Sequence, residues 1–157
     1  MSVNANWPRW IFASCSKHFA DAIGNELEFF VEGQKRHFTG AKDRAEFRFD
    51  GPRIIEYSKN FFHVFVEINV LIHSVMDNTD FHHVHRSAGL VATAFTTIPL
   101  YRYGDGTEDD GLIFGCLYLL QSGRANSIEI NHIGQVDPAV PAMQSSLEGH
   151  YTTYLEN

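Results

Sequence analysis

The sequence predicts an α+β fold with a mainly antiparallel, sandwich-like sheet, an N-terminal helix and a second helix packed on the sheet. Two observations support this prediction. Residues 62–72 alternate between apolar even positions and mixed odd positions, which is the pattern of a long strand with one buried face. Apolar residues then recur at intervals of three and four from Phe81 to Phe95, which is the pattern of an amphipathic helix.

The N-terminal helix is predicted between Asn6 and Gly24. Asn6 belongs to a residue type that caps helices, and Pro8 is tolerated in a first turn, where its missing N–H group costs nothing. Apolar residues follow at helical spacing until Gly24, a residue type that commonly ends helices. One face of this helix should therefore be buried.

Two strands are predicted before the long one. Residues 26–32 are predicted to form a short strand, and the polar residues 33–44 a loop or hairpin arm. Residues 45–57 alternate again, but a Gly-Pro pair interrupts them, which indicates a bulge, a bend or a sheet edge. The turn residues 58–60 then predict an antiparallel hairpin with the long strand.

The second half of the chain is predicted to contain a solvated loop and three strands. The loop extends from Gly104 to Gly111 and is the most acidic segment. The apolar run 113–120 predicts a buried strand, residues 127–133 predict a second, and alternation over 146–155 predicts a closing strand.

Composition limits the possible classes of protein. With 157 residues, 44% of them hydrophobic and 13% aromatic, the chain should fold as a single domain over residues 1–157. The net charge of −7, with no basic patch, argues against tight nucleic-acid binding. We find neither a signal-peptide pattern nor the roughly 20 apolar residues of a membrane span. We therefore expect a soluble protein made in the cytoplasm, without a membrane partner.

A small metal-dependent enzyme using His82, His83 and His85 is a remote alternative. On a helix, His82 and His85 would share a face and could approach one ion. A metal site needs three or four ligands, however, and the positive charge of Arg86 would oppose a cation. We therefore predict no metal site here and assign His82, His85 and Arg86 to a subunit contact.

No other catalytic or cofactor motif is found. The acidic loop offers oxygen ligands of the kind that Ca²⁺ or Mg²⁺ prefers, but it lacks the order of a calcium-binding loop, which favours a solvated charged loop. We find no nucleophile elbow, phosphate-binding loop or dinucleotide fingerprint. Cys15 and Cys116 lie in apolar stretches and should be buried free thiols. The chain is thus predicted not to be an enzyme and to use no cofactor.

Three strings in the second half resemble those of phage neck and tail proteins. They are Ile98-Pro-Leu-Tyr-Arg-Tyr-Gly-Asp-Gly, Ile130-Asn-His-Ile-Gly-Gln-Val-Asp-Pro and Leu147-Glu-Gly-His-Tyr. With the order of predicted elements, they make residues 50–156 similar to the tail terminator (tail completion) family of long-tailed bacteriophages, whose fold is related to that of the tail tube.

The resemblance implies a structural protein of the virion. Six copies would form a ring at the head-proximal end of the tail tube, stop tube polymerisation and join the tail to a head-side connector or stopper protein. DNA would pass through the central channel. The implied partners are further copies of the chain, the tail tube protein and the connector. A tail-tube subunit, another neck protein and an unrelated ligand-binding module remain alternatives.

Three residues on the hairpin strands are predicted to face the channel, where acidic groups would repel phosphates. They are Glu56, Glu67 and Asn69. If Glu67 and Asn69 face the channel, the apolar even positions of the long strand pack beneath the second helix. The loop is predicted to contact a neighbouring ring or partner through Tyr101, Arg102, Tyr103, Asp105, Glu108, Asp109 and Asp110.

Overall fold

The computed structural model describes residues 3–32, 43–75, 82–104, 110–122, 125–135 and 142–157. The elements follow one another as α1 (Trp7–Ile23), β1 (Glu28–Val31), β2 (Arg44–Ser58), β3 (Phe61–Val75), α2 (His83–Thr93), β4 (Ile98–Tyr101), β5 (Ile113–Leu119), β6 (Gln121–Ser122), β7 (Ala125–Asn126), β8 (Ile128–Gly134) and β9 (Ala142–Glu156). Within the described ranges, no helix is long and apolar enough to cross a membrane.

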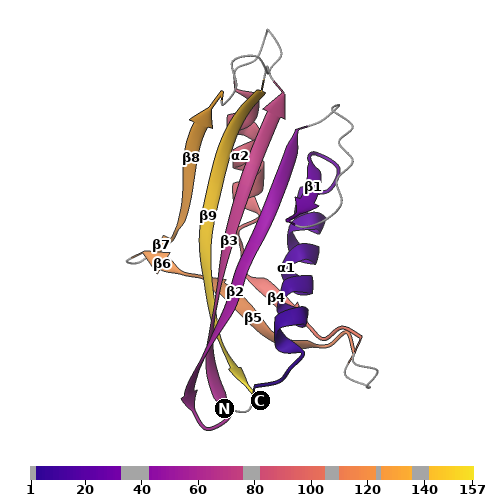
Figure 1. The fold of residues 1–157 in the computed structure, drawn as a ribbon, viewed down its shortest axis with the longest axis vertical. Coiled ribbons are helices and arrows are strands. Elements are labelled where there is room, and N and C mark those ends of the chain that lie inside the picture. The colour runs from indigo at the N-terminus through magenta and orange to yellow at the C-terminus, as the bar shows by residue number, and fades with distance from the viewer. Residues whose placement is uncertain (1–2, 33–42, 76–81, 105–109, 123–124, 136–141) are drawn as a thin grey trace.

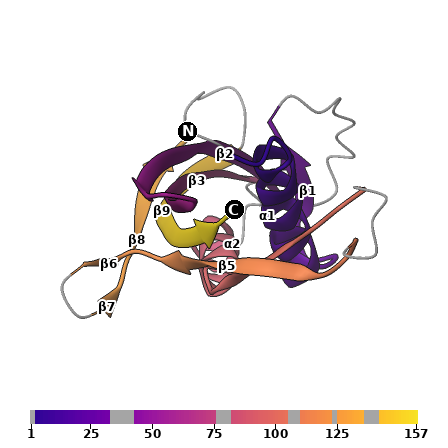
Figure 2. The ribbon, with the colours of Figure 1, turned by 90° about the horizontal axis from the view of Figure 1, so that it is seen from below.

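Seven strands form one curled sheet in the order β1-β2-β3-β9-β5-β4, with β8 also paired to β9. Strands β1 and β2 are parallel, and the other neighbours are antiparallel. Both helices lie on the concave side of the sheet, and the short β6–β7 hairpin projects from it (Figures 1 and 2). The predicted α+β class with a mainly antiparallel sheet is confirmed, whereas the sandwich-like arrangement is not.

Strands β2 and β3 form the predicted antiparallel hairpin. The interruption at Gly51 is a bulge inside one continuous strand, because the pairing register shifts between Asp50 and Arg53. Gly51 has a φ of 110°, and a Cβ atom there would lie 3.0 Å from the carbonyl oxygen of Phe65. Glycine is therefore required by both the backbone conformation and the space.

The core lies between the concave face of the sheet and the two helices. The even positions of β3 from Phe62 to Ile72 are all buried, whereas the odd positions are partly exposed. Val84, Ala88 and Val91 of α2 pack in the same core. The predicted packing of the apolar strand face against the second helix is confirmed for these residues, while Phe81 lies outside the described ones.

Helix α1 starts and ends where predicted, although its first turn is held differently. The Asn6 side chain makes no capping hydrogen bond; instead the Asn6 N–H donates to Asn4 Oδ1 over 2.9 Å. At the other end, the Gly24 N–H donates to the Ala20 carbonyl over 3.0 Å. The sequence pattern therefore located the helix but misjudged the role of Asn6.

Strand β5 is not the buried strand that its apolar sequence predicts. Leu117 is buried, but Ile113 and Tyr118 are 56% and 55% exposed. The strand pairs along β4 yet shares only two residue pairs with β9, so it lies away from the centre of the core. Cys116 on β5 is accordingly only partly buried, whereas Cys15 is fully buried and its burial raises the thiol pKa to about 12.

Candidate functional site

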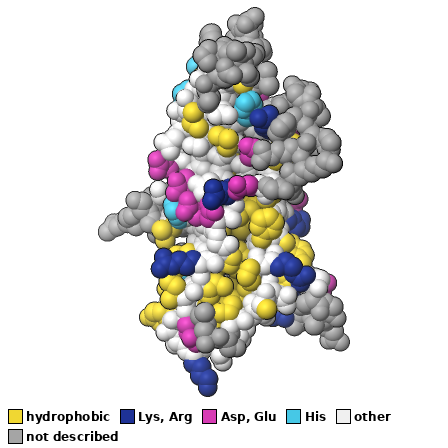
Figure 3. Space-filling model, in the orientation of Figure 1, with side chains coloured by type: hydrophobic (Ala, Val, Ile, Leu, Met, Phe, Trp, Pro, Cys, Tyr) yellow, Lys and Arg dark blue, Asp and Glu magenta, His cyan; other side chains and the backbone are white. Residues whose placement is uncertain are grey.

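The convex face of the sheet, opposite the helices, carries the odd-numbered side chains of β3. Acidic side chains form a band across the middle of this face, and hydrophobic side chains gather below it (Figure 3). We call this band the acidic belt. It consists of Glu32, Arg48, Asp50, Glu67, Asn69, Glu129, Asn131, Glu148 and His150.

Strand register brings the belt together from segments far apart in the chain. One row of directly paired residues consists of Arg48, Asn69, Glu148 and Glu129, on β2, β3, β9 and β8. The next row consists of Asp50, Glu67 and His150. Side chains of paired residues lie on the same face of a sheet, so the two rows form one continuous polar surface.

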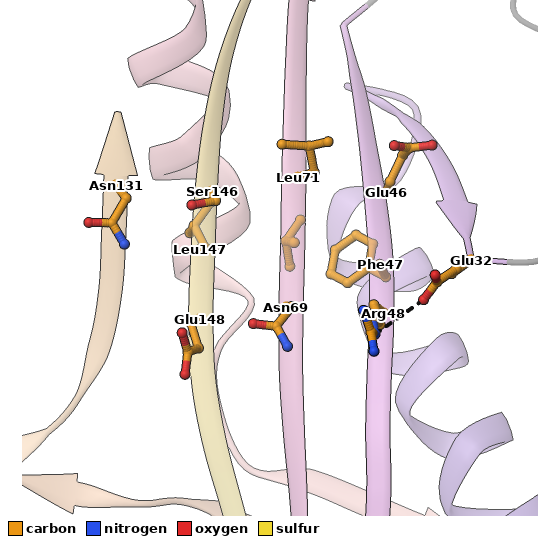
Figure 4. A pocket seen from close by; sticks show the side chains of 11 residues that line it. Glu32, Glu46, Phe47, Arg48, Asn69, Leu71, Asn131, Ser146, Leu147 and Glu148 are labelled. Atoms are coloured by element: carbon orange, nitrogen blue, oxygen red, sulfur yellow. Dashed lines mark ion pairs between the residues drawn. The ribbon is translucent and has the colours of Figure 1, made fainter. Parts of the chain in front are cut away.

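A network of polar contacts links the members of the belt. Arg48 Nε lies 3.0 Å from Asp50 Oδ1 and 3.3 Å from Glu32 Oε2, the ion pair drawn in Figure 4. Asn69 Nδ2 donates to Asp50 Oδ2 over 3.1 Å and to Glu67 Oε1 over 2.9 Å. Glu32, Arg48, Asn69 and Glu148 border a hollow on this face that is also lined by Leu71 and Ser146 (Figure 4).

Like charges lie opposite one another at two places in the belt. Asp50 lies directly opposite Glu67, and Glu148 directly opposite Glu129. Like charges at directly paired positions are destabilising, and exposed ion pairs contribute little. Because facing carboxylates of this kind do not favour folding, the belt is a candidate for function.

Aromatic side chains from three strands lie beside the belt. The Phe61 and Tyr154 rings stack with centroids 5.4 Å apart, and the His63 ring stacks on Tyr154 at 4.3 Å. Tyr57 is 73% exposed. We call this surface the aromatic patch; it comprises Ile55, Tyr57, Phe61, His63, Phe65 and Tyr154. Contiguous exposed apolar side chains of this kind mark interaction sites.

Other apolar side chains are exposed elsewhere. Leu112 precedes β5, Ile113 is its first residue, and Ile130 and Ile133 lie on β8. Among the described strands, β8 pairs only with β9, so its outer edge is open. The molecule thus presents apolar surface at several separate places.

The structure separates the three residues predicted to face a channel. Glu67 and Asn69 lie in the centre of the acidic belt. Glu56 is paired with Phe62, which faces the core side of the sheet. The register shift at the bulge reverses which positions of β2 face outward, so Glu56 is exposed but does not share a face with Glu67.

The segment predicted as a partner-binding loop begins with anchored residues. Tyr101 ends β4, and the Tyr103 carbonyl accepts hydrogen bonds from Arg9 over 2.7 Å and from Trp10 Nε1 over 2.8 Å. The Arg102 guanidinium lies over the Trp10 ring at 5.8 Å. These residues are therefore built onto α1 and are not part of a freely solvated loop.

Of the acidic residues predicted in that segment, the structure describes only Asp110. Asp110 is exposed, and its Oδ1 accepts the Gly104 N–H over 2.7 Å. Asp105, Glu108 and Asp109 lie outside the described residues. Their assignment to a partner contact stays a prediction.

The residues predicted for a subunit contact lie on the surface. His82, His85 and Arg86 are all exposed at the start of α2. The His85 ring lies 6.1 Å from that of His82 and 4.6 Å from that of His132 on β8. Sequence reasoning missed His132 because no spacing along the chain links β8 to α2.

Comparisons with known proteins give the fold but no family. No family model and no curated protein matches the chain. A search of solved structures finds a protein that is 14% identical in sequence to this chain, with a TM-score of 0.50. The match covers 92% of this chain and 94% of that protein. The name of that protein states no activity, and at this identity the similarity shows the fold alone.

Proposed function

We propose that this chain is a virion structural protein of the tail terminator type, without catalytic activity. Six copies form a ring that ends the tail tube, joins it to the head-side connector and lets DNA pass. The observation that carries the proposal is the convex sheet face, where the acidic belt lies beside the aromatic patch. The resemblance of residues 50–156 to phage neck and tail proteins supports the same role.

The acidic belt suits the wall of a DNA channel. Five carboxylates and one guanidinium leave the belt strongly negative, and such a surface repels phosphates over a Debye length of roughly 8 Å at physiological salt. DNA could therefore slide without being trapped. Glu67 and Asn69, at the centre of the belt, are assigned to the channel wall.

The separate apolar surfaces suit a ring. A closed ring uses a heterologous contact, in which one surface of a protomer meets a different surface of its neighbour. The aromatic patch supplies one such surface, and the open edge of β8 with Ile130 and Ile133 supplies a second. His82, His85 and Arg86 would extend the contact beside β8, while residues 101–110 would meet the tube or the connector.

Electron microscopy of the purified protein, alone and mixed with phage tail tubes, tests the proposal. We expect discrete six-fold rings, or protein that binds one end of the tubes and stops their growth. Open-ended tubes formed by the protein itself would instead support the tail-tube alternative. Protein that forms neither rings nor tubes and ignores tube ends would refute the proposal.

A charge-reversal variant tests the channel assignment separately. Glu67→Lys should still form rings, because Glu67 lies outside the apolar surfaces, but phage assembled with it should eject DNA more slowly. Asp21→Lys, on the exposed face of α1, is the matched control. Unchanged infectivity and DNA ejection with Glu67→Lys would remove the channel assignment.

A further inference from the structure

Three metal-ligating side chains converge in the acidic belt. Glu67, Glu148 and His150 each offer one ligand atom, and these atoms all lie within 4.8 Å of one another. Among the residues that the structure describes, no other three histidine, cysteine or acidic side chains meet this closely. We propose that these residues bind one divalent transition-metal ion, with Zn²⁺ as the best fit. The proposal holds for the single chain and does not depend on the ring.

The backbone places the three ligands firmly. Glu67 and His150 are directly paired on β3 and β9, and Glu148 precedes His150 by two residues, so all three side chains lie on one face. Ligand atoms bound to one Zn²⁺ at about 2.0–2.2 Å lie at most about 4.4 Å apart. Small side-chain rotations therefore suffice to close the site.

The chemistry of the ligands selects the kind of ion. An imidazole nitrogen with two carboxylates is a mixed nitrogen and oxygen set, which suits Zn²⁺ and related ions, whereas Ca²⁺ and Mg²⁺ prefer oxygen alone. His150 is exposed, so water can complete the coordination from the solvent side. This mixed set distinguishes the site from a simple cluster of acidic residues.

The contacts around the ligands favour ion binding. Asn69 Nδ2 donates to Glu67 Oε1 over 2.9 Å and so orients that carboxylate, as outer-shell partners of metal ligands do. The guanidinium of Arg48 is paired with Glu32 and Asp50 and acts on Glu67 only through its charge. His150 Nε2 lies 2.7 Å from Glu148 Oε1, within hydrogen-bond distance. A metal ion bound by both groups would take the place of that hydrogen bond, with the imidazole proton on Nδ1.

Metal titration of the untagged chain tests the site. After treatment with a chelator, the protein should bind one Zn²⁺ or one Co²⁺ per chain, and Co²⁺ should give a visible absorption band of a low-coordinate site. Glu148→Gln and His150→Ala should each weaken binding by at least about 100-fold, and Asn69→Ala by about tenfold. Zn²⁺ should also raise the melting temperature of the wild-type chain.

Two matched controls separate this site from its surroundings. Glu129→Gln removes a belt carboxylate that is not a ligand but lies opposite Glu148, so it should weaken binding far less than Glu148→Gln does. His85→Ala removes an imidazole from the His82, His85 and His132 group and should not change the affinity. Circular dichroism checks that each variant folds. NMR spectra of the wild type give a test that needs no variant, because Zn²⁺ should shift the signals of the His150 ring. The proposal is overturned if the wild type binds neither ion stoichiometrically, if His150→Ala binds normally, or if His85→Ala abolishes binding.

Discussion

At the residue scale, Asp43 joins two elements through buried polar contacts. Its Oδ2 atom accepts hydrogen bonds from Ser74 Oγ on β3 over 2.8 Å and from Ser87 Oγ on α2 over 2.7 Å. Both serines are buried. Hydrogen bonds to a charged group are stronger than neutral ones, and an unpaired buried hydroxyl is costly.

Asp43→Ala should therefore lower the free energy of unfolding by about 2–3 kcal/mol, because two buried hydroxyls lose their acceptor. Urea denaturation measures the difference. Asp21→Ala, which removes only an exposed ion pair with Lys17, should change it by less than about 0.5 kcal/mol. Equal effects of the two variants would contradict the role of Asp43.

Gly149 is required by close packing rather than by backbone conformation. A Cβ atom at this position of β9 would lie 2.5 Å from Phe95 Cε1. We expect Gly149→Ala to destabilise the fold by about 1–3 kcal/mol through overpacking. Gly89→Ala in α2, where an added Cβ meets nothing within 4 Å, should instead stabilise it by roughly 0.5–1 kcal/mol. Thermal unfolding of both variants checks the opposite signs.

At the scale of elements, Phe19 joins α1 to the rest of the core. Its ring lies 4.8 Å from that of Phe47 on β2 and 5.2 Å from that of Phe95, which follows α2. Phe19 is fully buried, whereas Phe12 on the same helix is 46% exposed. The two phenylalanines thus form a matched pair.

Phe19→Ala should cost about 3–5 kcal/mol of folding free energy, since it removes a large buried ring and leaves a cavity. Phe12→Ala should cost less than about 1 kcal/mol because much of its ring is already in water. Guanidinium denaturation of both variants measures the difference. Similar losses would mean that α1 is not held by its buried face.

The elements that the sequence predicted well are those with strict periodicity. The β2–β3 hairpin and both helices have apolar residues at intervals of two or of three and four, which reflect burial of one face. Strand β5 was predicted to be buried because its sequence is uniformly apolar. The exposure of β5 follows from the strands with which it pairs. Those partners cannot be inferred from the sequence of β5 itself.

At the scale of the whole molecule, the aromatic patch can be tested as a subunit contact. The double variant Tyr57→Ser and Tyr154→Ser removes two exposed rings that do not belong to the core. We expect the variant chain to stay folded but to lose ring formation, because the contact loses its largest apolar anchors. Light scattering after gel filtration measures the mass, and circular dichroism checks the fold. Phe12→Ser is the control, and rings of normal mass in the double variant would exclude the patch.

The candidate site was predictable only in part. The mixed odd face of the long strand pointed to Glu67 and Asn69 because alternation separates the two faces of a strand. It could not indicate Asp50, Glu148 or His150, which reach Glu67 and Asn69 through pairing with β2 and β9. The sequence places Glu56 with Glu67 because it indicates a bulge in β2 but not which residues beyond the bulge face outward. The pairing register with β3 decides that.

By itself, the sequence determined the class of the fold, the long hairpin, the two helices and the apolar face that they bury. These features follow from local periodicity, which each segment carries independently of the others. Only the tertiary structure decided which charged residues meet, because cross-strand register joins residues that are up to about 100 positions apart, as Arg48 and Glu148 are. The acidic belt and the Glu67, Glu148 and His150 site are consequences of that register.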